Sequence, residues 1–261
     1  MKYGHNRIRN PTPLLLLRAS LSLLLLFVIA TIPITRGFRV VPSPVPAPLD
    51  NLVLGTVALP KVPSGDPSGF LDAAYERGFR RFDLARSYGG GKSEELFGEW
   101  LEGSSGGEVR REDIEIVTKG GMGNDKYGDP NRPLCTYTSL SDELTLSLNS
   151  LRTSYADLYM LHRDDPRIPV SSFVNWMNTL ISTDKIRRWG VSNWSRGRIE
   201  EAYEYAVSTN QKPPTATSPQ LSLAVPRGEV WPTTESVSCF SKREELEWYG
   251  RKGIEVMGWE A

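Results

Sequence analysis

The sequence predicts an α/β protein from residue 50 onward, a TIM-type (β/α)8 barrel of parallel strands. Two observations lead to this fold class. Short β-type runs alternate with helical stretches, and each crossover is long enough to bring the next strand parallel to the last. Polar residues capable of chemistry follow several of the runs, which is where such a barrel carries its functional groups.

Seven short runs of apolar and β-branched residues are predicted to be the strands. They occupy residues 52–56, 80–83, 114–118, 156–161, 186–191, 215–221 and 254–259. A closed barrel of this type needs eight strands. The count therefore predicts a barrel that lacks its last strand and helix, with an edge whose backbone groups have no partner.

Six stretches between these runs have the pattern of helices. They occupy residues 68–77, 92–102, 140–152, 172–183, 196–208 and 242–251. Ser195 precedes the fifth as an N-cap, and Gly78 and Gly253 follow the first and the last as C-caps. Residues 50–261 are therefore expected to form one barrel domain.

Charge is distributed unevenly along the chain. Residues 1–49 contain six basic residues and no acidic one, whereas the rest of the chain has 25 basic and 31 acidic residues. An acidic body has no general attraction for nucleic acid or for an anionic membrane. Cys135 and Cys239 cannot build a disulfide framework, and two histidines, His5 and His162, argue against a zinc site, so no metal is expected.

Residues 1–49 are predicted to be a targeting leader that ends in a Pro-rich linker. A basic start is followed by the almost wholly apolar run 21–32, and prolines recur from Pro42 to Pro48. This pattern is typical of a secretory signal. Only 17 residues separate Arg18 from Arg36, fewer than the roughly 20 of a transmembrane helix. Cleaved signal peptide and uncleaved transmembrane anchor both remain open, and membrane contact is expected only through an uncleaved leader.

The segment after the apolar run indicates the subcellular compartment to which the protein is directed. Phe38 and the acid-free stretch that follows it resemble the bipartite plastid leader of algae with complex plastids. The sequence therefore predicts entry into the secretory route, with the plastid as destination and an endomembrane anchor as the alternative.

Four residues with useful chemistry lie at or near the ends of predicted strands. Asp83 and Tyr88 belong to Phe-Asp-Leu-Ala-Arg-Ser-Tyr-Gly at 82–89, Lys119 follows Ile-Val-Thr, and His162 follows Leu-Tyr-Met-Leu. Singly, they could be a rim tyrosine, turn or strand-end charges and a loop histidine. Together at one edge of a barrel, they predict a site that donates a proton to a carbonyl oxygen.

Electrostatics suggests how the four residues would act. A free tyrosine has a pKa of about 10. A lysine ammonium about 4 Å away contributes roughly 4 kcal/mol at an effective dielectric of 20, which favours tyrosinate, so Lys119 is expected to lower the pKa of Tyr88. Asp83 is expected to hold Lys119 charged, and His162 to orient the substrate carbonyl.

These motifs resemble those of the aldo-keto reductases, in particular a bacterial-type branch. The match also includes Gly-Val-Ser-Asn at 190–193 and Ser-Pro-Gln at 218–220, and it extends over residues 52–261. The resemblance implies an NADP(H)-dependent oxidoreductase that reduces an aldehyde or ketone to an alcohol, with Tyr88 as general acid. The cofactor-binding residues it implies are Thr56, Ser192, Asn193, Gln220 and Trp259. Ser192, Asn193 and Gln220 would hold the nicotinamide carboxamide, and Trp259 would either stack on the ring or pack at a strand end.

Other interpretations remain open at this stage. No Gly-x-Gly-x-x-Gly motif opens a helix, which argues against a Rossmann enzyme. In the family that these motifs resemble, a segment after the position of Trp259 binds the adenosine 2′-phosphate of the cofactor. This segment has no counterpart in the sequence. The chain could therefore be a truncated gene product, a fragment that folds with a partner strand, or a catalytically inactive nicotinamide-binding or regulatory module. The sequence does not decide the carbonyl substrate, NADP against NAD, or the oligomeric state.

Overall fold

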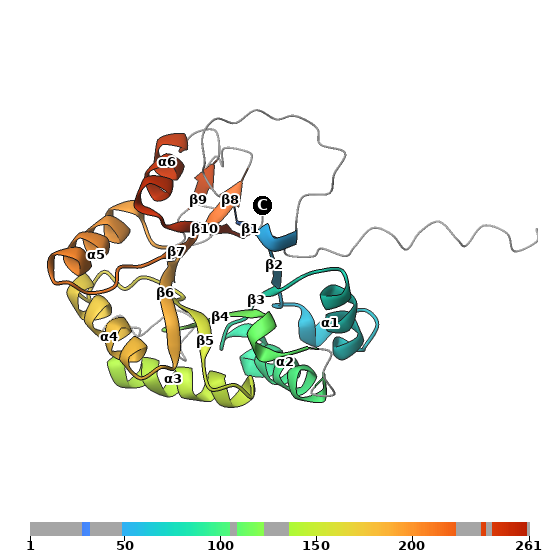
Figure 1. Cartoon of the computed structure of the whole chain (residues 1–261). Coiled ribbons are helices and arrows are strands. Elements are labelled where there is room, and N and C mark those ends of the chain that lie inside the picture. Colours follow the sequence, from blue (N-terminus) through green and yellow to red (C-terminus); the bar gives the residue numbers. More distant parts are fainter. Residues whose placement is uncertain are drawn as a thin grey trace, which may run out of the picture.

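The computed structural model describes residues 28–31, 49–104, 109–122, 136–222, 236–238 and 242–259. It confirms the predicted α/β barrel, because seven parallel strands among these residues form a barrel-shaped sheet with helices outside it (Figure 1). The parallel strands are β2 (Leu52–Gly55), β3 (Arg81–Asp83), β4 (Glu115–Gly120), β5 (Ala156–Leu161), β6 (Ile186–Ser192), β7 (Ala216–Ser218) and β10 (Glu255–Gly258).

All six predicted helices are present, with ends shifted by a few residues. They are α1 (Pro67–Glu76), α2 (Lys92–Gly103), α3 (Tyr137–Ser150), α4 (Val170–Ser182), α5 (Arg196–Ser208) and α6 (Arg243–Lys252). The predicted caps are confirmed: the Ser195 side chain accepts a hydrogen bond from the Arg198 N–H, and Gly78 and Gly253 have φ of 97° and 69°. Short 3-10 turns are η1 (Leu49–Asn51), η2 (Leu59–Lys61), η3 (Tyr88–Gly91) and η5 (Arg111–Asp113).

The predicted strand at 215–221 is wrong in its extent. The chain leaves β7 at Pro219 and enters β8 (Gln220–Ser222), which pairs in parallel with β9 (Ser236–Ser238) in a separate small sheet. Proline has no N–H to donate to a strand ladder, so the barrel pairing is interrupted at this residue. Gln220 nevertheless keeps a parallel bridge to Trp259, so the segment stays beside the end of β10.

A strand that the sequence did not predict lies between β10 and β2. It is β1 (Val28–Thr31), which comes from the apolar run assigned to the leader. β1 is antiparallel to both neighbours, with Ala30 opposite Gly258 on one side and Leu52 on the other, and so completes the ring. Its backbone gives partners to groups of β10 and β2 that would otherwise form two open edges.

The other predictions about the leader concern residues outside the described ranges and stay predictions. Among the helices that the structure describes, none combines the length and the apolar character that crossing a bilayer requires.

Side chains inside the barrel form layers along its axis because successive residues of a strand point to opposite faces. The middle of the barrel interior is apolar, and its cluster includes Val53, Val117, Leu158, Met160, Ala216 and Met257. At the amino-terminal ends of the strands, Arg81 and Arg188 each bridge Glu115 and Glu255, with N–O distances of 2.5–3.0 Å. The layer at the carboxyl ends is polar. Outside the ring, two further apolar clusters join the strands to the helices.

A close approach of α2 to the end of α3 generates a stability prediction. A Cβ atom at Gly98 would overlap the carbonyl oxygen of Ser150 and the backbone of Leu151. We expect Gly98→Ala to lower the free energy of unfolding by about 1–3 kcal/mol, because the overlapped atoms belong to backbone that cannot rotate away. Denaturant unfolding measures this loss.

Gly103→Ala is the matched control in the same helix, because a Cβ there meets nothing within 4 Å. Removing glycine flexibility should leave stability unchanged or raise it by up to about 1 kcal/mol. Equal stability of the two variants would contradict the described contact between α2 and α3.

Candidate active site

A cavity of about 220 Å³ lies at the carboxyl ends of the parallel strands. Strand alternation explains which side chains reach it. Phe82 packs outward against Phe97, so its neighbour Asp83 points inward, and Lys119 is the inward residue near the end of β4. Side chains at strand ends on its wall include Asp83, Lys119, His162, Ser192, Ser218 and Trp259.

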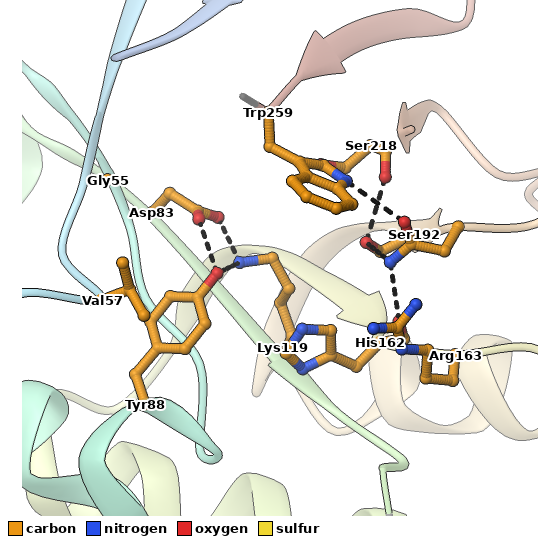
Figure 2. A pocket seen from close by; sticks show the side chains of 11 residues that line it. Gly55, Val57, Asp83, Tyr88, Lys119, His162, Arg163, Ser192, Ser218 and Trp259 are labelled. Atoms are coloured by element: carbon orange, nitrogen blue, oxygen red, sulfur yellow. Dashed lines mark hydrogen bonds and ion pairs between the residues drawn. The ribbon is translucent and has the colours of Figure 1, made fainter. Parts of the chain in front are cut away.

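Asp83, Tyr88 and Lys119 form one hydrogen-bonded cluster (Figure 2). The Lys119 Nζ lies 2.5 Å from Asp83 Oδ1, and it donates to the Tyr88 hydroxyl at 2.9 Å and to the Leu84 carbonyl at 3.0 Å. The Tyr88 hydroxyl donates in turn to Asp83 Oδ2 at 3.2 Å. The ammonium thus contacts a carboxylate, a phenol hydroxyl and a backbone carbonyl.

Burial changes the acidity of this cluster in a direction that the sequence did not predict. Burial and the negative charge of Asp83 raise the pKa of Tyr88 to about 12, although Lys119 acts to lower it. Lys119 does act to lower the pKa of Tyr88, as expected. The prediction that this pKa falls overall is nevertheless wrong, because burial and Asp83 outweigh Lys119. Burial opposes the charge on Lys119, but Asp83 and Tyr88 outweigh it and raise the lysine pKa. Tyr88 is a neutral proton donor beside a permanent ammonium near neutral pH.

His162 lies beside Tyr88, with ring centroids 6.0 Å apart and the ring planes at 78°. Its Nδ1 lies 3.3 Å from the hydroxyl of Ser87, a residue that sequence reasoning did not single out although it lies inside the same motif. Burial lowers the pKa of His162 well below its usual value, and Lys119 and Arg163 add to the effect. The imidazole is therefore neutral, with one N–H to donate.

A second wall of the cavity is a chain of hydrogen bonds from β6 to the end of β10. The Trp259 Nε1 donates to Asn193 Oδ1 at 3.1 Å, Asn193 Nδ2 donates to Ser192 Oγ at 2.9 Å, and Ser192 Oγ donates to the Ser218 carbonyl at 3.0 Å. Asn193 has a φ of 62°, a left-handed conformation that asparagine tolerates better than most residues. Trp259 and Ser192 lie across the cavity from Tyr88 (Figure 2).

Two of the predicted cofactor-binding residues lie outside the cavity wall. Thr56 is buried and donates its hydroxyl to the Asp83 carbonyl at 2.9 Å, while its neighbours Gly55 and Val57 line the cavity. Gln220 is also buried, and its Oε1 has no hydrogen-bond partner among the described residues. The structure thus brings together all four predicted catalytic residues with Ser192, Asn193 and Trp259.

Sequence reasoning also missed Arg163, which lines the cavity next to His162. It belongs to the Leu-His-Arg-Asp-Asp-Pro run at 161–166, which resembles the bacterial-type branch, but the sequence assigned it no role because it looks like an ordinary loop charge after a strand. In the part of the chain that the structure describes, no group of His, Cys, Asp and Glu residues could hold a metal ion.

Comparison with known sequences places most of the chain in one family. The model of the Aldo/keto reductase family matches residues 51–261. A putative voltage-gated potassium channel subunit beta of Schizosaccharomyces pombe is 33% identical over 152 residues, and a probable subunit of the same kind from Oryza sativa subsp. japonica is 30% identical over 161 residues. The matched regions cover 58% and 60% of this chain but only 43% and 46% of those proteins.

Solved structures are similar in fold. A thermostable aldo-keto reductase crystallised with the inhibitor epalrestat has a TM-score of 0.52 and 28% identity, with 64% of this chain and 57% of that chain covered. An aldo-keto reductase from Bacillus halodurans has a TM-score of 0.59 and 22% identity, with 77% and 59% covered. One from Klebsiella pneumoniae, in complex with NADP and acetate, has a TM-score of 0.59 and 23% identity, with 79% and 62% covered.

The buried ion pair leads to a prediction about stability. Lys119→Met should lower the free energy of unfolding by about 3–5 kcal/mol, because it leaves the Asp83 carboxylate buried without its ammonium. Adding Asp83→Asn to the same chain should restore part of that loss. Denaturant unfolding of the two single variants and the double variant measures the coupling, and additive losses would contradict a direct pair.

The low pKa of His162 leads to a second prediction. A free imidazole is half protonated near pH 6.5, whereas a lowered pKa means that His162 stays neutral when the pH falls through that value. Nitrogen NMR of labelled histidine, assigned by the signal lost in His162→Gln, should show a neutral ring at pH 6. A midpoint at or above 6.5 would contradict the burial that the structure describes.

Proposed function

We propose that this chain, which belongs to the aldo/keto reductase family, reduces an aldehyde or ketone to an alcohol with NADP(H), with Tyr88 as the general acid. One observation supports this most directly: the Tyr88 hydroxyl lies 2.9 Å from the buried Lys119 ammonium on the wall of a cavity. A phenol paired with an ammonium can give up a proton and leave a stabilised phenolate.

Each residue of the cluster has a role in that reaction. Bound NADPH would supply the hydride that reaches the carbonyl carbon. Tyr88 would give its proton to the carbonyl oxygen, and Lys119 would stabilise the phenolate that remains. Asp83 would keep Lys119 charged and in place. The neutral His162 would donate its N–H to the same oxygen and so orient the substrate.

The opposite wall fits a nicotinamide. Trp259 offers an aromatic surface to the cavity. Gln220, which is bridged to Trp259, lies behind this wall, and its buried amide oxygen lacks a partner within the described residues. The Ser192–Asn193 chain would hold this wall in place. The choice of NADP(H) follows the Klebsiella pneumoniae structures, whose complexes contain NADP and NADPH.

A second candidate function is a catalytically inactive nicotinamide-binding or regulatory barrel. The observation that favours it is the similarity to two proteins named as potassium channel β subunits. The intact cluster of Asp83, Tyr88 and Lys119 favours the enzyme, because binding alone does not require an ammonium beside a phenol.

Replacing the proposed acid tests the reductase. Tyr88→Phe should lower kcat for small aldehydes by about 10²–10⁴-fold, since it removes the proton donor. Its NADPH affinity should stay within about twofold. Turnover is followed by loss of NADPH absorbance, and affinity by quenching of tryptophan fluorescence.

Tyr203→Phe is the control, because it removes a phenol hydroxyl on α5, outside the cavity. It should behave as the unchanged chain does. Full activity of Tyr88→Phe would refute the assignment of the acid. NADPH binding without turnover of any aldehyde or ketone, together with stable association with another protein, would favour the regulatory function.

A further inference from the structure

Glu94 is a fully buried acid that lies outside the cavity wall. It belongs to the first turn of α2 and is 0% exposed. Its Oε1 accepts a hydrogen bond from the Thr118 hydroxyl at 2.7 Å, and its Oε2 pairs with the Arg86 guanidinium at 3.3 Å. Burying a carboxylate is costly, and an apolar side chain of similar volume often packs equally well. Packing alone therefore gives no reason for an acid here, and Glu94 has no part in the proton transfer proposed above.

Both partners of Glu94 are close neighbours of the proposed acid and its lysine. Thr118 precedes Lys119 in β4, and because strand residues alternate, Lys119 points into the barrel while Thr118 points outward to α2. Arg86 lies in the segment after β3, two residues before Tyr88. One carboxylate thus ties the strand that carries Lys119 to the segment that carries Tyr88.

The surrounding backbone brings Arg86 to Glu94. The Arg86 N–H donates to the Lys119 carbonyl at 3.1 Å, and the Arg86 guanidinium donates to Ser150 Oγ at 3.3 Å. This guanidinium lies against Gly91, where a Cβ atom would overlap it. Gly91 has a φ of 94°. Glycine at this position therefore permits the left-handed turn before α2 and also leaves room for the guanidinium.

The residue before Glu94 fixes the start of α2 against the same region of the barrel. The buried Ser93 hydroxyl donates to the Thr56 carbonyl at 2.9 Å, and the Thr56 hydroxyl donates to the Asp83 carbonyl at 2.9 Å. The first turn of α2 is thus attached to the ends of β2, β3 and β4. A carboxylate on that turn has a defined position relative to the cluster of Asp83, Tyr88 and Lys119.

We propose that Glu94 is a positioning residue, which acts through Thr118 and Arg86 to hold the Tyr88 hydroxyl beside the Lys119 ammonium. The contact that it maintains is the 2.9 Å hydrogen bond between these two groups. Lys119 stabilises the phenolate only at short range, because the attraction between charges falls with distance. Loss of either anchor should let the Tyr88 segment move relative to β4 and slow the proton transfer. This inference rests on the proposed reductase function and adds a residue to it.

Two substitutions at Thr118 separate positioning from packing. Thr118→Val keeps the side-chain volume but removes the hydroxyl that binds Glu94, whereas Thr118→Ser keeps the hydroxyl and loses a methyl group. Thr118→Val should lower kcat about 10- to 100-fold, the scale of loss for a misplaced reacting group, and Thr118→Ser should stay within about threefold of the unchanged chain. A role in packing alone predicts the reverse order, because serine leaves the larger gap. That reverse order would overturn the inference.

Glu94→Gln tests the acid itself. It keeps an acceptor for Thr118 but loses the charge that pairs with Arg86, so kcat should fall about 3- to 30-fold while NADPH affinity stays within about twofold. Glu95→Gln is the matched control, because it removes an exposed carboxylate, paired with Lys92, from the next position of the same helix. It should leave kcat unchanged. Full kcat in either Glu94→Gln or Thr118→Val would contradict the positioning role.

Nitrogen NMR of labelled lysine separates this inference from the proposed function, because it requires no turnover. The Lys119 Nζ signal is assigned by its loss in Lys119→Arg, and Tyr88→Phe shows where it lies without the hydroxyl. In Glu94→Gln and Thr118→Val the signal should move towards that position, and in Glu95→Gln it should not.

The two proposals can then fail independently. If the signal moves as expected but the unchanged chain reduces no aldehyde or ketone, the positioning role stands and the reductase proposal fails. If Tyr88→Phe loses turnover while Glu94→Gln and Thr118→Val change neither the signal nor kcat, the reductase proposal stands and the positioning role fails.

Discussion

The ion pair between Lys119 and Asp83 is the interaction on which the candidate site depends. Removing two charges from water costs several kcal/mol per ion, and direct attraction offsets this only when further hydrogen bonds satisfy the groups. Here the ammonium also binds Tyr88 and the Leu84 carbonyl, and the carboxylate accepts from Tyr88. The pair therefore holds the phenol in place, and its two charges act in opposite directions on the acidity of that phenol.

Strand register places this pair at the correct end of the barrel. Arg81 and Asp83 point inward from β3, and Glu115, Val117 and Lys119 from β4, so each strand contributes to successive interior layers. A shift of one residue would turn every inward side chain outward. The same alternation thus produces the charged layer at one end, the apolar layer in the middle and the polar cavity at the other end.

Closure of the sheet is a separate constraint. Parallel pairing continues from β2 around to β10, and β1 lies between those two strands in the antiparallel direction. Backbone N–H and C=O groups need partners whatever the side chains are. An apolar segment can provide these backbone partners whether it runs parallel or antiparallel to its neighbours. For this reason a segment with the composition of a signal could also pair as a strand. The position of β1 therefore brings an amino-terminal segment to the barrel seam, beside the strand that leads to Trp259.

The sequence by itself determined the helices, the approximate strands and the residues at the strand ends, because periodicity, caps and strand alternation are properties of neighbouring residues. From strand ends alone, Asp83, Lys119 and His162 could be expected on one face with Tyr88. Only the tertiary structure decided that Tyr88 becomes less acidic, that Thr56 and Gln220 lie behind the cavity wall, and that Arg163 lies on it. It also decided that β1 pairs between β10 and β2. The physical reason is that burial, summed charge and backbone pairing depend on elements far apart in the chain, whose distances no local pattern encodes.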